Sequence, residues 1–325
     1  MPSLKKIVVI SMLAIGSMSL SNSYRAEPRS ERSVSRTNEK FLGNVVGIRD
    51  TVPEEFTQYW NQLTPENNGK WQLVEPERDR MDWTKLDIFY EFSLSNNVIF
   101  KWHTPIWWHN PPKWLKDLPP SEQKAEFEEW IQAFMTRYPD TAIIEVVNEA
   151  LVEPPFYAEA LGGSGETGFD WVIEAFRIAR KQAPHAQLLI NEINVLKSNQ
   201  RTTKYIALIE LLKERGLVDG VGVQGHFLTK NDRERVSTNL DRITDIGLDV
   251  YITELDIRGP SEQAQLESYQ AIFPLFWENP HVKGITLWGY REGEIWQKDA
   301  YLLRKDGTER PALTWLKQYT QDDSS

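Results

Sequence analysis

Two glutamates lie at the ends of apolar segments, where a carboxylate is costly unless it has a purpose. Glu149 ends the run IIEVVNE, and Glu254 lies in VYITELDI. Burying a carboxylate without a partner is unfavourable, so each side chain is a candidate for chemistry. Two carboxylates across a cleft can cleave a glycosidic bond, one as a protonated acid at the leaving oxygen and the other as an ionised nucleophile. Their surroundings must then push the two pKa values apart.

An alternating pattern of segments predicts how these distant glutamates meet. Short apolar runs, typical of parallel strands covered on both faces, alternate with helical patterns. We expect strands within 41–48, 62–71, 97–107, 142–150, 187–193, 219–227, 248–257 and 282–290. We expect helices within 53–61, 83–97, 121–138, 169–183, 201–216, 236–247, 262–279 and 312–319. Eight strands, each followed by a helix, predict an α/β fold, a (β/α)8 TIM barrel with a single catalytic domain.

In such a barrel, functional side chains lie at the carboxyl ends of the strands. Six successive candidate strands end in polar or aromatic residues: His103, Trp107, Asn148, Glu149, Asn191, Glu192, Gln224, His226, Glu254, Asp256 and Trp288. One of them alone would be explained as a turn residue or a helix cap, but the set predicts an active site. We expect Asn148 to bind a sugar hydroxyl, and His226 to reach Glu254 and keep it ionised.

The composition is that of a soluble globular protein and excludes several other classes of site. Hydrophobic residues make up 40% of the 325 residues and charged residues 26%. The net charge of −10, without a long basic block, argues against nucleic acid as a partner. The absence of cysteine excludes disulfides and thiolate chemistry. The 13 tryptophans suit a sugar-binding cleft, because indole faces pack well on sugar rings.

Several short patterns resemble cofactor or nucleophile motifs but lack essential parts. GVGVQG (220–225) matches G-x-G-x-x-G, yet its glycines lie within an apolar run and no helix begins after them. GGSGETG (162–168) lacks the Gly-Lys-Ser/Thr ending of a phosphate loop. The sequence has neither H-E-x-x-H nor a G-x-S-x-G elbow. We therefore expect no catalytic metal and no cofactor.

The first residues predict export. Lys5 and Lys6 precede an apolar run that is shorter than a membrane-spanning helix and is followed by small residues. This predicts a signal peptide over 1–23 and a secreted protein, with no membrane association after cleavage. A frayed helix or an uncleaved anchor is the alternative. We expect a flexible segment over 24–40, the catalytic domain over 41–320, a polar tail over 321–325 and a monomer.

Six segments carry a resemblance to a known family. They are TPENNGKW (64–71), WHTPIWW (102–108), VVNEA (146–150), GVGVQGHF (220–227), ITELDI (252–257) and GITLWGYREGEIW (284–296). In this order they resemble glycoside hydrolase family 10, the endo-β-1,4-xylanases, from about residue 41 to 319. The resemblance implies hydrolysis of xylan and xylo-oligosaccharides with retained configuration, Glu149 as general acid/base and Glu254 as nucleophile. It also implies sugar-binding roles for Glu66, Asn67, Lys70, His103, Trp107, Asn148, Gln224, His226, Trp288 and Trp296.

The chain departs from the family pattern at three places near the cleft floor. Ile193 stands where the family commonly has a tyrosine, Trp108 where a histidine is common, and Ile144-Glu145 where Trp-Asp is usual. These departures leave both catalytic carboxylates in place. They keep open a preference for mixed β-1,3/1,4-xylan or activity as another retaining β-glycanase. A carbohydrate-binding protein without activity is disfavoured, because binding alone requires neither Glu149 nor Glu254.

Overall fold

The structure, a computed structural model, describes residues 40–47 and 49–322. The expected signal peptide, nearly all of the segment that follows it and the last three residues lie outside the described residues. Among the residues that are described, no helix is both long and apolar enough to cross a bilayer.

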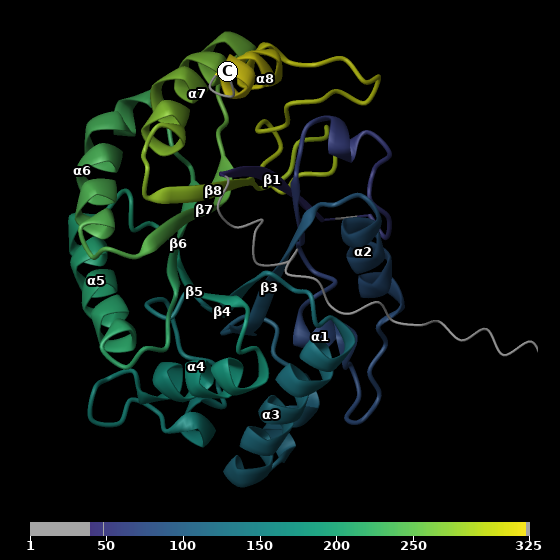
Figure 1. The fold of residues 1–325 in the computed structure, drawn as a ribbon, viewed down its shortest axis with the longest axis vertical. Helices are drawn as coiled ribbons and strands as arrows, with labels where there is room; N and C mark the ends of the chain where they lie inside the picture. Colours follow the sequence, from purple (N-terminus) through teal and green to yellow (C-terminus); the bar gives the residue numbers. More distant parts are fainter. Residues whose placement is uncertain (1–39, 48, 323–325) are drawn as a thin grey trace, which may run out of the picture.

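Eight parallel strands form a closed barrel in chain order, as predicted (Figure 1). They are β1 (Phe41–Val46), β2 (Gln62–Pro65), β3 (Ile99–Trp107), β4 (Ile143–Asn148), β5 (Gln187–Glu192), β6 (Gly220–His226), β7 (Asp249–Asp256) and β8 (Val282–Leu287). The pairing of β1 with β8 closes the barrel. The GVGVQG segment is part of β6, so its glycines do not form a phosphate-binding turn.

Helices surround the barrel on the outside (Figure 1). They are α1 (Trp71–Val74), α2 (Thr84–Ser95), α3 (Pro120–Arg137), α4 (Asp170–Gln182), α5 (Asn199–Lys213), α6 (Arg233–Thr244), α7 (Glu262–Trp277) and α8 (Pro311–Asp322). Short 3₁₀ turns add η2 (Phe56–Gln58), η3 (Lys113–Asp117), η4 (Ala158–Leu161) and η5 (Lys230–Asp232). Each long helix turns an apolar face toward the strands.

The prediction of a helix over 53–61 is wrong, since only the three-residue turn η2 forms there. Phe56 and Trp60 are buried at helical spacing, which explains the expectation. The chain must nevertheless turn into the sheet at Asn61, whose backbone N–H donates to Leu42 O and whose side-chain oxygen accepts from Leu42 N. This pairing leaves no room for a longer helix. The second strand is also shorter than expected and ends at Pro65.

An apolar plug closes the amino-terminal end of the barrel. It consists of residues at or near the starts of five strands, Phe41, Ile99, Ile143, Leu189 and Tyr251. Gly284 is required here, because a Cβ at this position would lie 2.1 Å from the ring of Phe41. Phe41 fills the space that a side chain on β8 would otherwise occupy.

A polar layer lies two residues further along the same strands. Since alternate residues of a barrel strand point inward, this layer contains Lys101, Glu145, Asn191 and Thr253. All four are buried. The Thr253 hydroxyl donates to the Asn191 side-chain oxygen at 2.6 Å. This layer lies inside the barrel, directly below the candidate site residues at the carboxyl ends of the strands.

Candidate active site

Glu149 lies immediately after β4, at the carboxyl end of the barrel. Its backbone has φ of 61°, a left-handed conformation that is uncommon for residues other than glycine and that is often found at functional sites. Two contacts with β5 hold this backbone in place. Glu149 N donates to Asn191 O at 2.8 Å, and Leu151 N donates to Glu192 Oε2 at 2.8 Å. The side chain is 9% exposed.

Three neutral groups donate hydrogen bonds to the Glu149 carboxylate. The indole N–H groups of Trp107 and Trp108 both donate to Oε2, each at 2.9 Å. The Gln224 amide donates to Oε1 at 3.1 Å. None of these donors carries a charge, so the carboxylate is oriented without a direct partner of opposite charge.

Glu254, on β7, has a different environment. His226 Nε2 lies 3.0 Å from Oε2 of Glu254, and the Asn191 amide donates to Oε1 at 2.8 Å. The other histidine nitrogen, Nδ1, lies 2.8 Å from Oδ2 of Asp256. The predicted contact between His226 and Glu254 is therefore confirmed.

The charges around Glu254 shift two pKa values in opposite directions. Burial by itself raises the pKa of Glu254, but the hydrogen bond from His226 and nearby positive charges, including Lys101, outweigh burial and lower it. Burial alone lowers the pKa of His226, whereas its hydrogen bonds to Asp256 and Glu254 raise it. The protonated histidine thus lies between two carboxylates and keeps Glu254 ionised.

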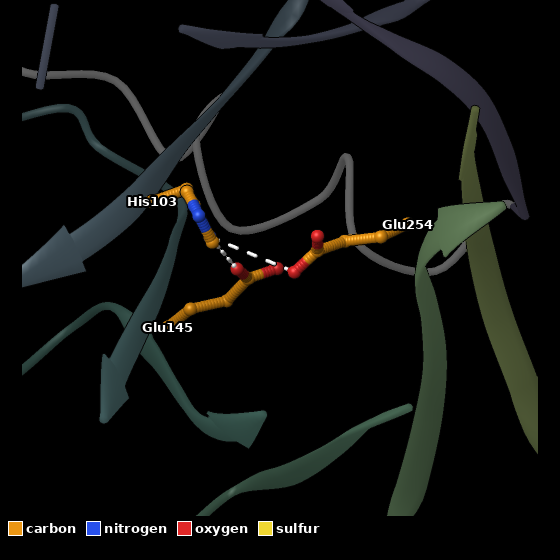
Figure 2. Close-up of side chains that lie close together, drawn as sticks. All are labelled: His103, Glu145 and Glu254. Atoms are coloured by element: carbon orange, nitrogen blue, oxygen red, sulfur yellow. Dashed lines mark hydrogen bonds and ion pairs between the residues drawn. The ribbon is translucent and has the colours of Figure 1, made fainter. Parts of the chain in front are cut away.

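Glu145, a buried carboxylate of the polar layer, lies close to His103 and Glu254 (Figure 2). His103 Nδ1 lies 2.6 Å from Glu145 Oε2 and 4.0 Å from Glu254 Oε1. Lys101 Nζ donates to Glu145 Oε1 at 2.5 Å. His103, Glu145 and Glu254 are close enough to hold a metal ion. The ammonium of Lys101 already supplies the cation at Glu145, so these residues fit an ion-pair network better than a metal site.

Amide side chains connect the two catalytic candidates. Asn148 Oδ1 accepts from Asn191 at 2.9 Å and from Gln224 at 3.1 Å. Asn191 also donates to Glu254, and Gln224 also donates to Glu149. The Gln224 Oε1 atom is buried and has no hydrogen-bond partner in the described part of the chain.

The expected residues after β2 lie on one side of this centre. Lys70 is buried, donates to Asn67 Oδ1 at 3.1 Å, and lies 4.6 Å from the ring centroid of Trp107. Burial lowers the pKa of Lys70, and burial also raises the pKa of Glu66. Lys70 therefore stabilises the indole that donates to Glu149, through a cation–π contact.

The two expected covering tryptophans differ in exposure. Trp288, after β8, is 6% exposed and packs edge-on against the rings of His103 and His226, at 5.0 and 6.2 Å between centroids. Trp296 is 51% exposed, and its indole donates to Asp256 Oδ2 at 2.8 Å. Trp288 is part of the barrel mouth, whereas Trp296 presents much of its ring to solvent.

A family model for glycosyl hydrolase family 10 matches residues 32–319. The chain belongs to this family. Among curated relatives, endo-1,4-beta-xylanase B of Cellvibrio japonicus is 40% identical over 281 residues, 85% of this chain and 45% of that protein. Endo-1,4-beta-xylanase B of Thermotoga neapolitana is 30% identical over 249 residues, 73% of this chain and 72% of that protein. The family 10 chain thus spans less than half the length of the Cellvibrio relative.

Solved structures of family 10 xylanases share the barrel. Xylanase 10B from Thermotoga maritima has a TM-score of 0.77 at 26% identity, covering 90% of this chain and 98% of that one. Xylanase 10B from Thermotoga petrophila, solved with xylobiose, has a TM-score of 0.75 at 26% identity, covering 92% and 99% of the two chains.

The structure of this family 10 member brings together the residues that the sequence predicts at the strand ends, with two supports that the strand-end pattern does not include. One is Lys101, which lies two positions before His103 inside an apolar strand and shares its inward face. The other is Trp108, which in the sequence is only a departure from the family pattern. Its bond to Glu149 depends on the path of the loop after β3, which residue spacing does not reveal.

Proposed function

We propose that the chain is a retaining endo-β-1,4-xylanase. The observation that carries this proposal is the contrast between the two glutamates. Glu254 lies among positive charges that keep it ionised, as a nucleophile requires. Glu149 accepts hydrogen bonds from three neutral donors and has no direct partner of opposite charge, which suits the role of general acid/base. The similarity to family 10 xylanases supports the same assignment.

The reaction then takes two steps. In the first, an oxygen of Glu254 attacks the anomeric carbon while Glu149 gives its proton to the glycosidic oxygen, and the leaving chain departs as an alcohol. In the second, the Glu149 carboxylate takes a proton from water, the resulting hydroxyl attacks the anomeric carbon, and Glu254 is released as a carboxylate. Two inversions at one carbon give net retention.

The surrounding side chains are proposed to bind the sugar. Asn67, Lys70, Asn148, Gln224 and His226 provide polar groups for the reacting ring. Glu66, His103 and Trp107 complete this set, and Trp288 and Trp296 supply aromatic surfaces. Indoles close to the reacting ring leave little space for the C5 hydroxymethyl group of glucose, which favours xylose.

Product analysis tests the proposal. We expect the chain to release short oligomers from β-1,4-xylan, and proton NMR to show the β-anomer first. Parallel digests of mixed β-1,3/1,4-xylan and cellulose serve as the comparison. Initial release of the α-anomer would contradict the nucleophile assignment. Faster cleavage of mixed-linkage xylan or cellulose would instead show that the preferred substrate is not β-1,4-xylan. Ile193, which departs from the family pattern, would then be the first candidate to explain the different preference.

We further propose that the protein is secreted as a monomer, with residues 1–23 as its signal peptide and 41–320 as its catalytic domain. Support comes from the basic residues and the short apolar run at the amino terminus. Amino-terminal sequencing of the exported protein would locate the cleavage site.

A further inference from the structure

Trp108 makes a contact with Glu149 that has no part in the two reaction steps. Its indole N–H and that of Trp107 converge on the same oxygen of Glu149, Oε2, each at 2.9 Å. The two indoles come from neighbouring residues and meet edge to face, with ring centroids 6.1 Å apart. Both side chains are partly buried.

This convergence makes the two oxygens of Glu149 unequal. A carboxylate oxygen has about two lone-pair sites for hydrogen bonds. The two indoles fill both sites of Oε2. Oε1 accepts one bond, from Gln224 at 3.1 Å, and so retains one free site. A proton on Oε2 would displace an indole N–H, and a partly buried donor would then lose its partner.

We propose that Trp108 is a positioning residue for acid catalysis, and that with Trp107 it confines the proton of Glu149 to Oε1. Oε1 is then the oxygen that protonates the glycosidic oxygen. As the proton leaves, negative charge develops on the carboxylate, and the two indole donors at Oε2 stabilise it. This inference rests on the proposed acid/base role of Glu149.

An indole is well suited to this task. It donates one hydrogen bond, accepts none and keeps its proton across the working range of an enzyme. A histidine, the residue common at this position in the family, can gain or lose a proton and can also accept. With Trp108, the orientation of Glu149 does not depend on the protonation of a neighbour.

The test is the variant Trp108→Phe with two leaving groups on the same sugar. Phenyl β-xylobioside needs protonation of its leaving oxygen, whereas 2,4-dinitrophenyl β-xylobioside does not. We expect kcat/KM for the phenyl glycoside to fall roughly tenfold or more, as for loss of a hydrogen bond to a charged group. The value for the dinitrophenyl glycoside should stay within about twofold. Trp108→His, which restores an N–H donor, should recover much of the loss.

Trp114→Phe is the matched control. The Trp114 indole also donates one hydrogen bond, to Glu75 O at 3.0 Å, but outside the cleft. The Trp114→Phe change should leave kcat/KM for both glycosides unchanged. Equal losses on both substrates in Trp108→Phe, or no loss on either, would overturn the proposal.

Glu149→Ala separates this proposal from the function on which it rests. If that variant loses activity on the phenyl glycoside, keeps it on the dinitrophenyl glycoside and responds to azide, the acid/base role stands whatever Trp108 does. A neutron structure of the unaltered protein locates the proton directly, even if the variants fail to fold. Deuterium on Oε1 of Glu149 is expected, and deuterium on Oε2 would refute the assignment.

Discussion

Trp296 has two separate contacts at the cleft, one through its ring and one through its N–H. The ring lies 5.0 Å from that of His226, and the N–H donates to Asp256. Asp256 in turn holds the histidine that keeps Glu254 ionised. A change at this residue can therefore affect substrate selection, the charge of Glu254, which we propose as the nucleophile, or both.

Two variants separate these effects. Trp296→Ala removes the ring, so we expect weaker xylan binding by about 1–3 kcal/mol and a smaller preference for aryl xylobioside over aryl cellobioside. Trp296→Phe loses the N–H but keeps an aromatic ring, although a smaller one, so it should retain more of the preference than Trp296→Ala. The measurement is the ratio of kcat/KM for aryl xylobioside to kcat/KM for aryl cellobioside in each variant. Thermal stability of each variant serves as the control. An unchanged ratio in a stable Trp296→Ala protein would contradict the steric explanation.

Glu192 connects strand β5, helix α5 and the loop after β4. It ends β5, is fully buried, and pairs with Arg201 on α5 at 2.8 Å. It also accepts from Leu151 N in the loop that carries Glu149. Burial raises the pKa of Glu192 even though these partners oppose the shift. The carboxylate therefore positions the loop after β4.

Glu192→Gln tests this connection. The change preserves volume but leaves Arg201, which is 25% exposed, without its partner of opposite charge. We expect a loss of about 1–3 kcal/mol in the free energy of unfolding and a lower kcat, since the Glu149 loop loosens. Glu174→Gln, at a more exposed pair with Lys124, should cost less than about 1 kcal/mol. Urea denaturation and xylan assays measure both. Equal effects of the two changes would count against a positioning role.

The elements could be predicted from the sequence better than the details of the site. Apolar runs located all eight strands, because buried parallel strands are apolar on both faces. Simple alternation from the inward-facing Thr253 would place Leu255 inward, whereas a register shift between Ile252 and Leu255 accompanies the inward position of Glu254. Such irregularities arise from the pairing of strands and redirect side chains near active sites, so spacing within one strand does not show them.

For the whole molecule, the Glu254–His226 pair predicts how stability depends on pH. The folded pKa of His226 is raised, to about 10, so its contribution is complete below its unfolded value of about 6.5 and is lost as pH rises toward 10. The folded pKa of Glu254 is lowered, so its contribution is complete above about 4.3 and is lost as pH falls. Both contribute fully between roughly pH 4.5 and 6.5.

Urea denaturation at several pH values measures this dependence. Above about pH 6.5, His226 should lower the free energy of unfolding by up to about 1.4 kcal/mol per pH unit, since the folded state binds one more proton. In His226→Gln, the free energy of unfolding should decline less steeply with pH. The slope should be smaller by the amount that one bound proton contributes, up to about 1.4 kcal/mol per pH unit. An identical slope in the variant would show that other groups cause the decline.

Barrel closure has a consequence for the order of folding. The pairs Phe41–Gly284 and Asn44–Leu287 join β1 to β8, which are the first and the eighth strand of the described barrel in chain order. Contacts between residues so distant in sequence form late and slowly. A nascent chain that has not reached Val282 has unpaired edges on β1 and β7, which are prone to association with other chains. Trp288 and Trp296 follow β8, so the barrel closes and its cleft is completed within the same short stretch of chain.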